Sequence, residues 1–229
     1  MGNIATSEDT AEPVPAPWRL EGSGLLLLLK TSAAARDPRW HAMSGTDELA
    51  RSGLGLLMFV DYQRSDAGPY RELLFIPGQF QCGQRRAWSV TRILVSSQAS
   101  VAGGRANWGI PKELGKFRLS GEPGDSLELG VSQDGQPVAD IAWHSRGPAL
   151  PVTTAVVPKA LRTLIQILDG KQFQLVPSAS GRIGAARVDR LETNPALFPA
   201  LDLRRVVAAL SVPRFKMTFP VADISPWLR

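Results

Sequence analysis

The chain has few of the residues that form metal centres and covalent cross-links. Among its 229 residues, Cys82 is the only cysteine, and His41 and His144 are the only histidines. A single cysteine excludes an intrachain disulfide and a multi-cysteine metal site. The two histidines lack the close spacing of paired metal ligands. The sequence therefore gives no support for a metal site.

Common catalytic signatures are also missing. The sequence contains no Walker A loop, no HExxH motif and no GxSxG motif. The glycine-containing stretch at residues 22–24 precedes an apolar run instead of following one, which is the wrong order for a dinucleotide fingerprint. The sequence therefore gives no motif-based support for nucleotide binding, for a zinc protease or for a serine hydrolase.

Long apolar runs are absent as well. The run at residues 25–29 is far shorter than the roughly 20 residues that cross a bilayer. Residues 1–17 are acidic, contain proline and alanine, and lack the apolar stretch of a secretory signal. We expect a disordered leader at 1–17, a single domain at 18–229, no membrane contact and a cytoplasmic location.

Basic residues are in excess but do not cluster. Lysine and arginine total 26 against 21 acidic residues, which gives a net charge of +5. The densest groups are the arginine pairs at 85–86 and 204–205. No run reaches the five or six like charges of a basic tail. We expect no nucleic-acid partner, because that would call for a basic stripe with interleaved aromatic residues. Attraction of small anionic substrates is the function that we assign to the positive field.

Short apolar segments separated by Gly, Pro, Asp and Ser predict a mainly β fold. Asp134-Gly135 and Asp169-Gly170 each lie between two apolar runs, which is typical of a type I′ hairpin. Hairpins favour an antiparallel meander or barrel over parallel βαβ units. The predicted strands are 24–30, 54–62, 71–76, 88–95, 114–120, 127–132, 137–143, 164–168, 172–176 and 182–190.

Helical patterns are few. Leu203, Val206, Val207 and Leu210 recur at the spacing of one helix face, with Asp202 available as N-cap. A second short helix is expected at residues 46–50, ending before Gly53.

Lys112 lies in an unusually apolar stretch, after Trp108 and Ile110 and before Leu114 and Phe117. Most lysines are on the surface, and a strand-edge lysine with a buried stem also fits this pattern. A lysine attacks a ketone only as the neutral amine, and its ordinary pKa near 10.4 leaves well under ~0.1% neutral at pH 7. A lysine that acts as a nucleophile at pH 7 needs a pKa about 3 units below the ordinary value. Burial in an apolar pocket can lower the pKa by that amount.

Two segments resemble those of the acetoacetate decarboxylase family. Residues 104–112, Gly-Arg-Ala-Asn-Trp-Gly-Ile-Pro-Lys, resemble the family segment in which G-x-P-K carries the Schiff-base lysine. Residues 68–72, Gly-Pro-Tyr-Arg-Glu, are similar to the family's G-P-Y-x-E segment, which contributes a pocket glutamate. Residues 217–220 agree more weakly with its C-terminal part, and the resemblance covers 18–229.

The resemblance implies a mainly β fold of the α+β class, an antiparallel, cone-like β-barrel with a few short helices. It also implies an apolar cavity, a reaction that needs no cofactor, and a homo-oligomer. Lys112 would form an iminium with a small-molecule oxo acid, and Glu72 would orient the substrate or move a proton. Tyr70 and Trp108 would form part of the cavity wall. Arg105 is our candidate for the substrate carboxylate, because a guanidinium suits bidentate anion binding; a surface ion pair is the alternative.

Glu113 departs from the family pattern, because the decarboxylases carry a second lysine there. An added cation would lower the pKa of Lys112, whereas an anion nearby would raise it. On an extended segment neighbouring side chains point to opposite faces, so Glu113 can point away from Lys112 even though it belongs to the same candidate site. Three functions stay open: a 3-oxo acid decarboxylase, a related aldolase-dehydratase, and a non-catalytic protein that binds a small ligand in the same cavity.

Overall fold

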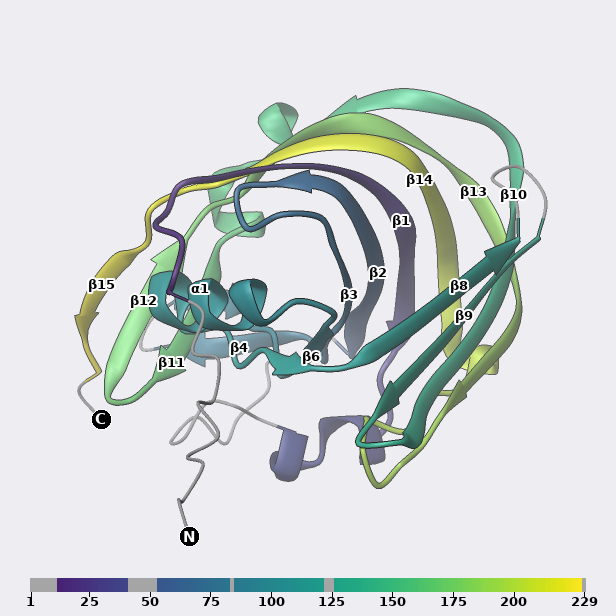
Figure 1. Ribbon diagram of the computed structural model, residues 1–229, viewed down its shortest axis with the longest axis horizontal. Coiled ribbons are helices and arrows are strands. Elements are labelled where there is room, and N and C mark those ends of the chain that lie inside the picture. Colours follow the sequence, from purple (N-terminus) through teal and green to yellow (C-terminus); the bar gives the residue numbers. More distant parts are fainter. Residues whose placement is uncertain (1–11, 41–52, 83–84, 122–125, 228–229) are drawn as a thin grey trace, which may run out of the picture.

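The computed structural model describes residues 12–40, 53–82, 85–121 and 126–227. Its main element is a ten-stranded sheet in the order β7-β6-β3-β2-β1-β14-β13-β10-β9-β8. The long strands curve strongly around a common interior (Figure 1). The strands are β1 (Trp18–Lys30), β2 (Leu54–Ser65), β3 (Tyr70–Ile76), β6 (Arg92–Val95), β7 (Glu113–Leu114), β8 (Lys116–Gly121), β9 (Ser126–Gln133), β10 (Gln136–Thr153), β13 (Ser178–Thr193) and β14 (Val206–Phe219).

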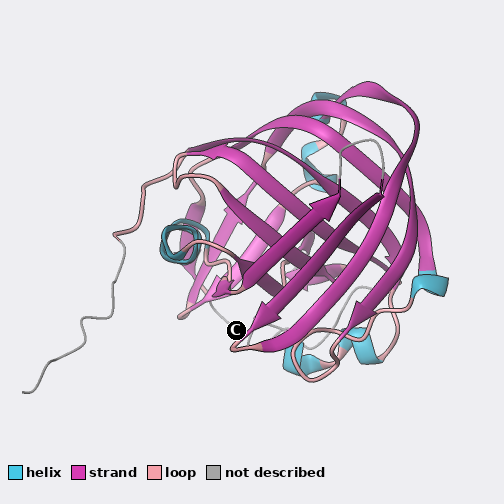
Figure 2. Ribbon diagram, turned by 45° about the vertical axis from the view of Figure 1, so that its right-hand side comes forward, coloured by secondary structure: helices cyan, strands magenta, loops and turns pink. Residues whose placement is uncertain are grey.

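A second, five-stranded sheet has the order β15-β12-β11-β5-β4. Together with helix α1 (Gln98–Trp108) it lies at one end of the large sheet, on the left of Figure 1. Figure 2 shows this helix, nearly end-on, beside the curved strands. Within the described ranges no helix has the length and apolarity to cross a membrane. The remaining elements are β4 (Gln79–Cys82), β5 (Arg85–Trp88), β11 (Leu164–Leu168), β12 (Lys171–Leu175), β15 (Asp223–Pro226), and the 3-10 helices η1 (Ala34–Arg36), η2 (Pro38–Trp40), η3 (Thr154–Val156), η4 (Lys159–Leu161) and η5 (Leu203–Arg205).

The two edge strands of the large sheet, β7 and β8, are joined by one residue, Gly115. The Gly115 amide donates to the Val95 carbonyl at 2.9 Å, at one edge. A Cβ on Gly115 would lie 3.3 Å from the Ser132 carbonyl oxygen, near the other edge. The sheet therefore almost closes on itself. The prediction of a mainly β, antiparallel barrel with a few short helices is confirmed.

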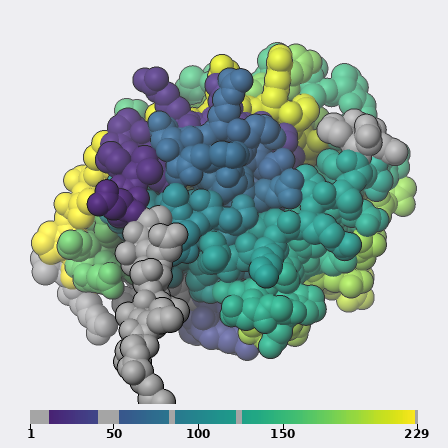
Figure 3. Space-filling model, viewed as in Figure 1, coloured from purple at the N-terminus to yellow at the C-terminus, as the bar shows by residue number. Residues whose placement is uncertain are grey.

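Successive side chains of β1, β2 and β3 point to opposite faces, so these strands belong to two hydrophobic cores. On one face Leu27, Leu57 and Phe75 join a cluster with residues of β9 and β10. On the other face Tyr70 and Leu74 pack with residues of α1, β12 and β14. In the space-filling view the early strands (purple to blue) lie directly beside the teal segment that contains α1 (Figure 3). This second core contains the candidate site.

The two Asp-Gly hairpins form as predicted. Asp134 and Gly135 have φ angles of 49° and 78° and connect β9 to β10. Asp169 and Gly170 have φ angles of 50° and 71° and connect β11 to β12. Both pairs adopt the left-handed backbone that a type I′ turn requires.

The helix predicted near residues 203–210 is wrong. Only the 3-10 helix η5 forms there, with the Asp202 side chain accepting from the Arg204 amide at 2.9 Å. From Val206 onward the chain is strand β14, which pairs with β1 on one side and β13 on the other. Hydrogen bonding to two neighbours outweighs a local helical spacing among residues that include the β-branched Val206 and Val207. The helix expected at 46–50 lies outside the described residues.

Part of the predicted leader is packed against α1. The Val14 carbonyl accepts from Asn107 Nδ2 at 2.8 Å and from Trp18 Nε1 at 3.1 Å. The Ala16 amide donates to Asn107 Oδ1 at 3.2 Å. Residues 1–11 lie outside the described residues, so their disorder stays a prediction.

Replacing Leu27 with alanine should lower the free energy of unfolding by about 2 to 5 kcal/mol, because the side chain is 0% exposed and its loss leaves a cavity. Urea unfolding measures this change. Leu150→Ala is the matched control: it removes the same atoms from a side chain that is 63% exposed and should change stability by about 0.5 kcal/mol at most. Equal losses in the two variants would contradict the assignment of this core.

Candidate active site

A cavity of about 430 Å³ lies between the large sheet on one side and α1 and the small sheet on the other. Apart from Lys112 and Glu72, its inner wall is built almost entirely from apolar and aromatic side chains. The lining residues are Trp18, Leu20, Leu26, Leu56, Met58, Tyr62, Tyr70, Glu72, Leu74, Ile76, Trp88, Val90, Ile93, Trp108, Ile110, Lys112, Thr154, Leu161, Arg162, Leu164, Pro177, Ala179, Met217 and Phe219.

Helix α1 positions Lys112. The helix ends at Trp108 and is capped by Gly109, whose left-handed backbone (φ 61°) turns the chain back and whose amide donates to the Arg105 carbonyl at 3.0 Å. The returning chain places the Lys112 stem against Gly104. A Cβ on Gly104 would lie only 2.5 Å from Lys112 Cδ, so the helix can pack this closely only because the residue is glycine.

The ammonium group of Lys112 lies at the centre of a buried polar cluster. Lys112 Nζ is 2.9 Å from Glu72 Oε2, and both residues are 4% exposed. Nζ also donates to Ser100 Oγ at 3.0 Å and to the Tyr70 hydroxyl at 3.5 Å. The second carboxylate oxygen of Glu72 accepts from the Tyr62 hydroxyl at 3.3 Å. Lys112 and Glu72, which lie far apart in the sequence, are thus direct partners.

The pKa of Lys112 is set by two opposing effects. Burial lowers it, but the Glu72 carboxylate and the hydrogen bonds within the cluster outweigh burial, so the pKa is raised above its ordinary value. From the sequence we expected burial to lower the pKa of Lys112, and Glu113 was the anion that we considered as a cause of a raised pKa. The Glu72 carboxylate at 2.9 Å is the reason for the difference, because an opposite charge within about 4–6 Å favours the charged form.

The two tyrosines of the cluster stay protonated. Burial and the neighbouring Glu72 carboxylate raise the pKa of Tyr62 well above its ordinary value. Burial also raises the pKa of Tyr70, although the Lys112 ammonium group opposes this effect. The rings of Tyr62 and Tyr70 pack with their centroids 4.6 Å apart. Each tyrosine therefore offers a hydrogen-bonding hydroxyl on an otherwise apolar wall.

Glu113 does not point into the cavity. Its carboxylate forms an ion pair with Arg92 at 2.6 Å and accepts from Gln133 Nε2 at 2.7 Å. Burial would raise the pKa of Glu113, but the hydrogen bonds from Arg92 and Gln133 lower it below its ordinary value. Glu113 instead links β7 to β6 and β9, next to the point where the sheet closes. Glu113 is not among the residues that line the cavity, so its predicted place in the substrate site stays a prediction without support from this position.

Arg105 does not line the cavity either. It is exposed on α1, and its Nε donates to the Lys112 carbonyl oxygen at 2.9 Å. The side chain therefore fixes the backbone of the lysine segment, and the predicted contact of Arg105 with a substrate carboxylate stays a prediction without support from this position. Arg162 is instead the guanidinium that lines the cavity in the described part of the chain.

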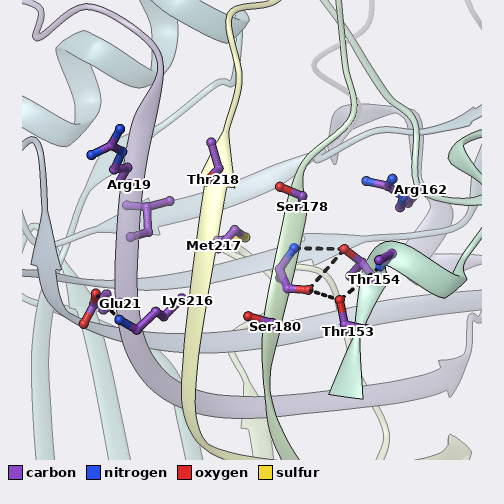
Figure 4. Close-up of a pocket in the computed structure, with 13 residues that line it drawn as sticks. Arg19, Glu21, Thr153, Thr154, Arg162, Ser178, Ser180, Lys216, Met217 and Thr218 are labelled. Carbon is purple, nitrogen blue, oxygen red and sulfur yellow. Dashed lines mark hydrogen bonds and ion pairs between the residues drawn. The ribbon is translucent and has the colours of Figure 1, made fainter. Parts of the chain in front are cut away.

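Arg162 lies where the cavity meets a polar surface groove. The groove has a volume of about 540 Å³ and shares Leu20, Thr154, Arg162, Ala179 and Met217 with the cavity. In Figure 4 Arg162 lies on one side of β13, and the Glu21–Lys216 ion pair lies farther along the groove. Among the described residues, no carboxylate lies within ion-pairing distance of Arg162; its guanidinium donates to the carbonyls of Val157 and Pro177.

Trp108 and Tyr70 line the cavity, as the resemblance implied for its wall. Sequence reasoning did not find Ser100, Tyr62, Trp18 or Arg162. Ser100 follows the helix N-cap Ser97 and is completely buried, and no sequence motif marks its contact with Lys112. In the described residues, no group of three His, Cys, Asp or Glu side chains is arranged to hold a metal ion.

The chain is similar to known proteins in sequence and in fold. Residues 48–196 match the acetoacetate decarboxylase (ADC) family. A crystal structure of acetoacetate decarboxylase from Legionella pneumophila has 17% sequence identity and a TM-score of 0.73, with 100% of both chains covered. No curated protein sequence matches the chain.

Two further structures have similar folds. The enduracididine biosynthesis enzyme MppR, complexed with the condensation product of pyruvate and imidazole 4-carboxaldehyde, has 13% identity, a TM-score of 0.65 and coverage of 98% of this chain and 97% of its own. An acetoacetate decarboxylase-like enzyme from Sphingomonas wittichii RW1 has 14% identity, a TM-score of 0.62 and coverage of 94% and 95%. At these identities the likeness concerns the fold.

Gly104→Ala should displace the Lys112 stem, because the new Cβ would overlap Lys112 Cδ. We expect a loss of about 1 to 3 kcal/mol in the free energy of unfolding from overpacking, although alanine normally favours a helix over glycine. Urea unfolding measures this change. Gly130→Ala is the control, because its nearest neighbouring atoms would be 3.7 Å away. A Gly104→Ala protein as stable as Gly130→Ala would contradict the packing described.

Glu72→Gln should lower the pKa of Lys112, because it removes the charge that raises it and leaves burial in place. Mass-spectrometric labelling of Lys112 across pH measures the pKa, with the exposed Lys216 as internal reference. In the wild type, the raised pKa contributes stability that is complete below the ordinary lysine pKa and is lost as the pH rises through the raised value. The variant should lack this alkaline loss. An unchanged labelling profile would contradict the role of Glu72.

Proposed function

The chain belongs to the acetoacetate decarboxylase family, and from this premise we propose that it is an enzyme that forms an iminium between Lys112 and an oxo acid. The observation that supports the proposal is the buried pair of Lys112 and Glu72 at 2.9 Å in a largely apolar cavity. A buried lysine with one carboxylate partner has both the nucleophile and the proton acceptor that imine formation requires.

Glu72 is the group that would accept the proton of Lys112 and so produce the neutral amine. In the ligand-free protein Lys112 is held as an ammonium group, because the Glu72 carboxylate raises its pKa. An incoming substrate carboxylate would place a second anion near Glu72, and like charges in one site favour protonation of one of them. Transfer of a proton across the 2.9 Å contact would then neutralise both partners and leave Lys112 able to attack.

The reaction that we propose begins with attack of Lys112 Nζ on the oxo carbon and loss of water, which leaves a protonated imine. In a 3-oxo acid the bond to the carboxylate carbon then breaks. Its electron pair moves toward the iminium nitrogen, CO2 leaves and an enamine remains. Glu72 gives its proton to the departing hydroxyl when the imine forms, so the enamine carbon takes a proton from solvent, relayed through Glu72 or through Tyr70 at 3.5 Å from Nζ. Water then hydrolyses the resulting iminium and releases the ketone. The lysine is regenerated.

The cavity wall favours loss of CO2. Leu74, Val90, Ile93 and Phe219 offer a carboxylate no hydrogen bonds, whereas neutral CO2 needs none. A charge in such surroundings is destabilised relative to the neutral product. We therefore place decarboxylation of a 3-oxo acid first. Aldol and dehydration chemistry through the same iminium is the related reaction, and the MppR complex with a pyruvate condensation product supports keeping it.

Arg162 replaces Arg105 as the arginine to which we assign a role toward the substrate anion, namely attraction to the entrance of the cavity and not contact during the reaction. It lines both the cavity and the groove, and among the described residues it has no acidic partner. Its positive charge at this junction would attract an oxo acid to the entrance. The rest of the sequence-based proposal, a cytoplasmic protein that forms a homo-oligomer, stays a prediction.

The second candidate is a protein that binds a small acid or ketone without turning it over. The raised pKa of Lys112 favours this function, because a lysine that stays charged is an anion ligand and not a nucleophile. The two candidates differ in whether a covalent imine forms.

Borohydride reduction in the presence of acetoacetate and a panel of 2-oxo and 3-oxo acids should trap an adduct on Lys112. Peptide mass spectrometry locates it among the six lysines, and Lys112→Ala should abolish it. Lys116→Ala, which removes an exposed lysine four residues away, is the matched control and should keep the adduct. Reversible binding of the acids without any trapped adduct would overturn the enzyme proposal in favour of the binding protein.

A further inference from the structure

We propose that the substrate of this site is an oxo acid with a long apolar chain beyond its oxo carbon, and not acetoacetate itself. This inference deepens the proposed function and rests on it. Its first observation is size: about 430 Å³ lies within the range of roughly 300–1,000 Å³ that holds drug-sized ligands. A four-carbon acid would leave most of this space unfilled.

The register of β2 and β3 gives the cavity a direction. On β3, Glu72, Leu74 and Ile76 all line it, and on β2 their neighbours Met58 and Leu56 do so as well. Leu56 pairs with Ile76 and Met58 with Leu74, so these residues form a continuous wall that leads away from Glu72. From Glu72 to Ile76 the wall extends roughly 13 Å, because a strand advances about 3.3 Å per residue. An extended chain of about ten carbons covers that length, at roughly 1.3 Å per carbon.

The wall also lacks free hydrogen-bonding groups for a polar chain. Three tryptophans line the cavity, and each donates its indole N–H to a backbone carbonyl: Trp18 to Val14, Trp88 to Leu161 and Trp108 to Pro220. These aromatic rings therefore present carbon to the cavity.

The hydroxyl of Thr154, which lines the cavity away from the two tyrosines of the Lys112 cluster, already has hydrogen-bond partners. Its Oγ1 donates to the Ala179 carbonyl at 3.2 Å and accepts from the Ala179 amide at 2.9 Å. Polar groups with capacity for a ligand are thus concentrated at the Lys112 cluster and at Arg162. A polar chain along the Leu56–Ile76 wall would lose its hydrogen bonds to water without replacement, whereas an alkyl chain gains by leaving water.

The test is a chain-length series of 3-oxo acids from acetoacetate to 3-oxohexadecanoate, which extends past the length of the wall, with CO2 release measured on the full chain. The spontaneous rate, taken with Lys112→Ala, is subtracted. We expect kcat/KM to rise about fourfold for each added methylene until the wall is covered. An ω-carboxy acid of matched length distinguishes an apolar chain from an anionic one that reaches Arg162, and it should be the poorer substrate.

Leu56→Trp places bulk at the end of the wall away from Glu72 and should move the optimum to shorter acids. Leu150→Trp makes the same kind of change on a side chain that is 63% exposed and outside the cavity lining, and it should leave the series unchanged. A series in which acetoacetate is the best substrate, or in which the ω-carboxy acid is preferred, would overturn the inference and leave the lysine chemistry standing.

Binding of unreactive 2-alkanols, followed by tryptophan fluorescence, separates the inference from the proposed function. Affinity that rises with chain length, together with no borohydride adduct from any acid, would overturn the Lys112 chemistry and support the apolar-chain preference. Affinity that is independent of chain length would overturn the preference, whatever the outcome of trapping.

Discussion

Lys112 and Glu72 are each 4% exposed, and neither could remain charged in that position without the other. Removing either partner leaves a buried charge that must be neutralised or solvated, at a cost of several kcal/mol. The pair therefore fixes how α1, which carries Gly104 and Ser100, lies over β3, which carries Glu72. The helix, the sheet and the polar cluster are held together by this contact at 2.9 Å.

The same contact gives the site its chemistry. Burial alone would lower the pKa of Lys112 and favour the neutral amine. The Glu72 carboxylate raises this pKa, so the paired lysine is a cation. In the mechanism that we propose, a substrate anion entering the cavity would shift the proton from Lys112 to Glu72. Selectivity for anionic ketones would then come from the electrostatics of this proton transfer as well as from the shape of the cavity.

Those parts of the fold and of the candidate site that depend on neighbouring residues could be predicted from the sequence. Asp134-Gly135 forms its hairpin because few other dipeptides accept positive φ at both positions. Lys112 and Glu72 lie in short segments that resemble a family, so their participation could be named without coordinates.

The remainder depends on contacts between distant parts of the chain. The helical spacing after Asp202 is overridden by strand pairing to β1 and β13, which a local pattern does not contain. The direction of Arg105 depends on where α1 packs, and the raised pKa of Lys112 depends on a distance between residues 40 positions apart. Ser100 and Arg162 enter the site through tertiary packing alone.

Closure of the sheet through Gly115 has a consequence for folding. Its two edges meet three residues after Lys112, so the lysine segment is placed correctly only once strands from both halves of the chain have assembled. Such non-local pairing is entropically expensive and forms late in β proteins. Partly folded molecules would therefore have an unassembled site. A count of reactive Lys112 sites would serve as a count of completely folded molecules.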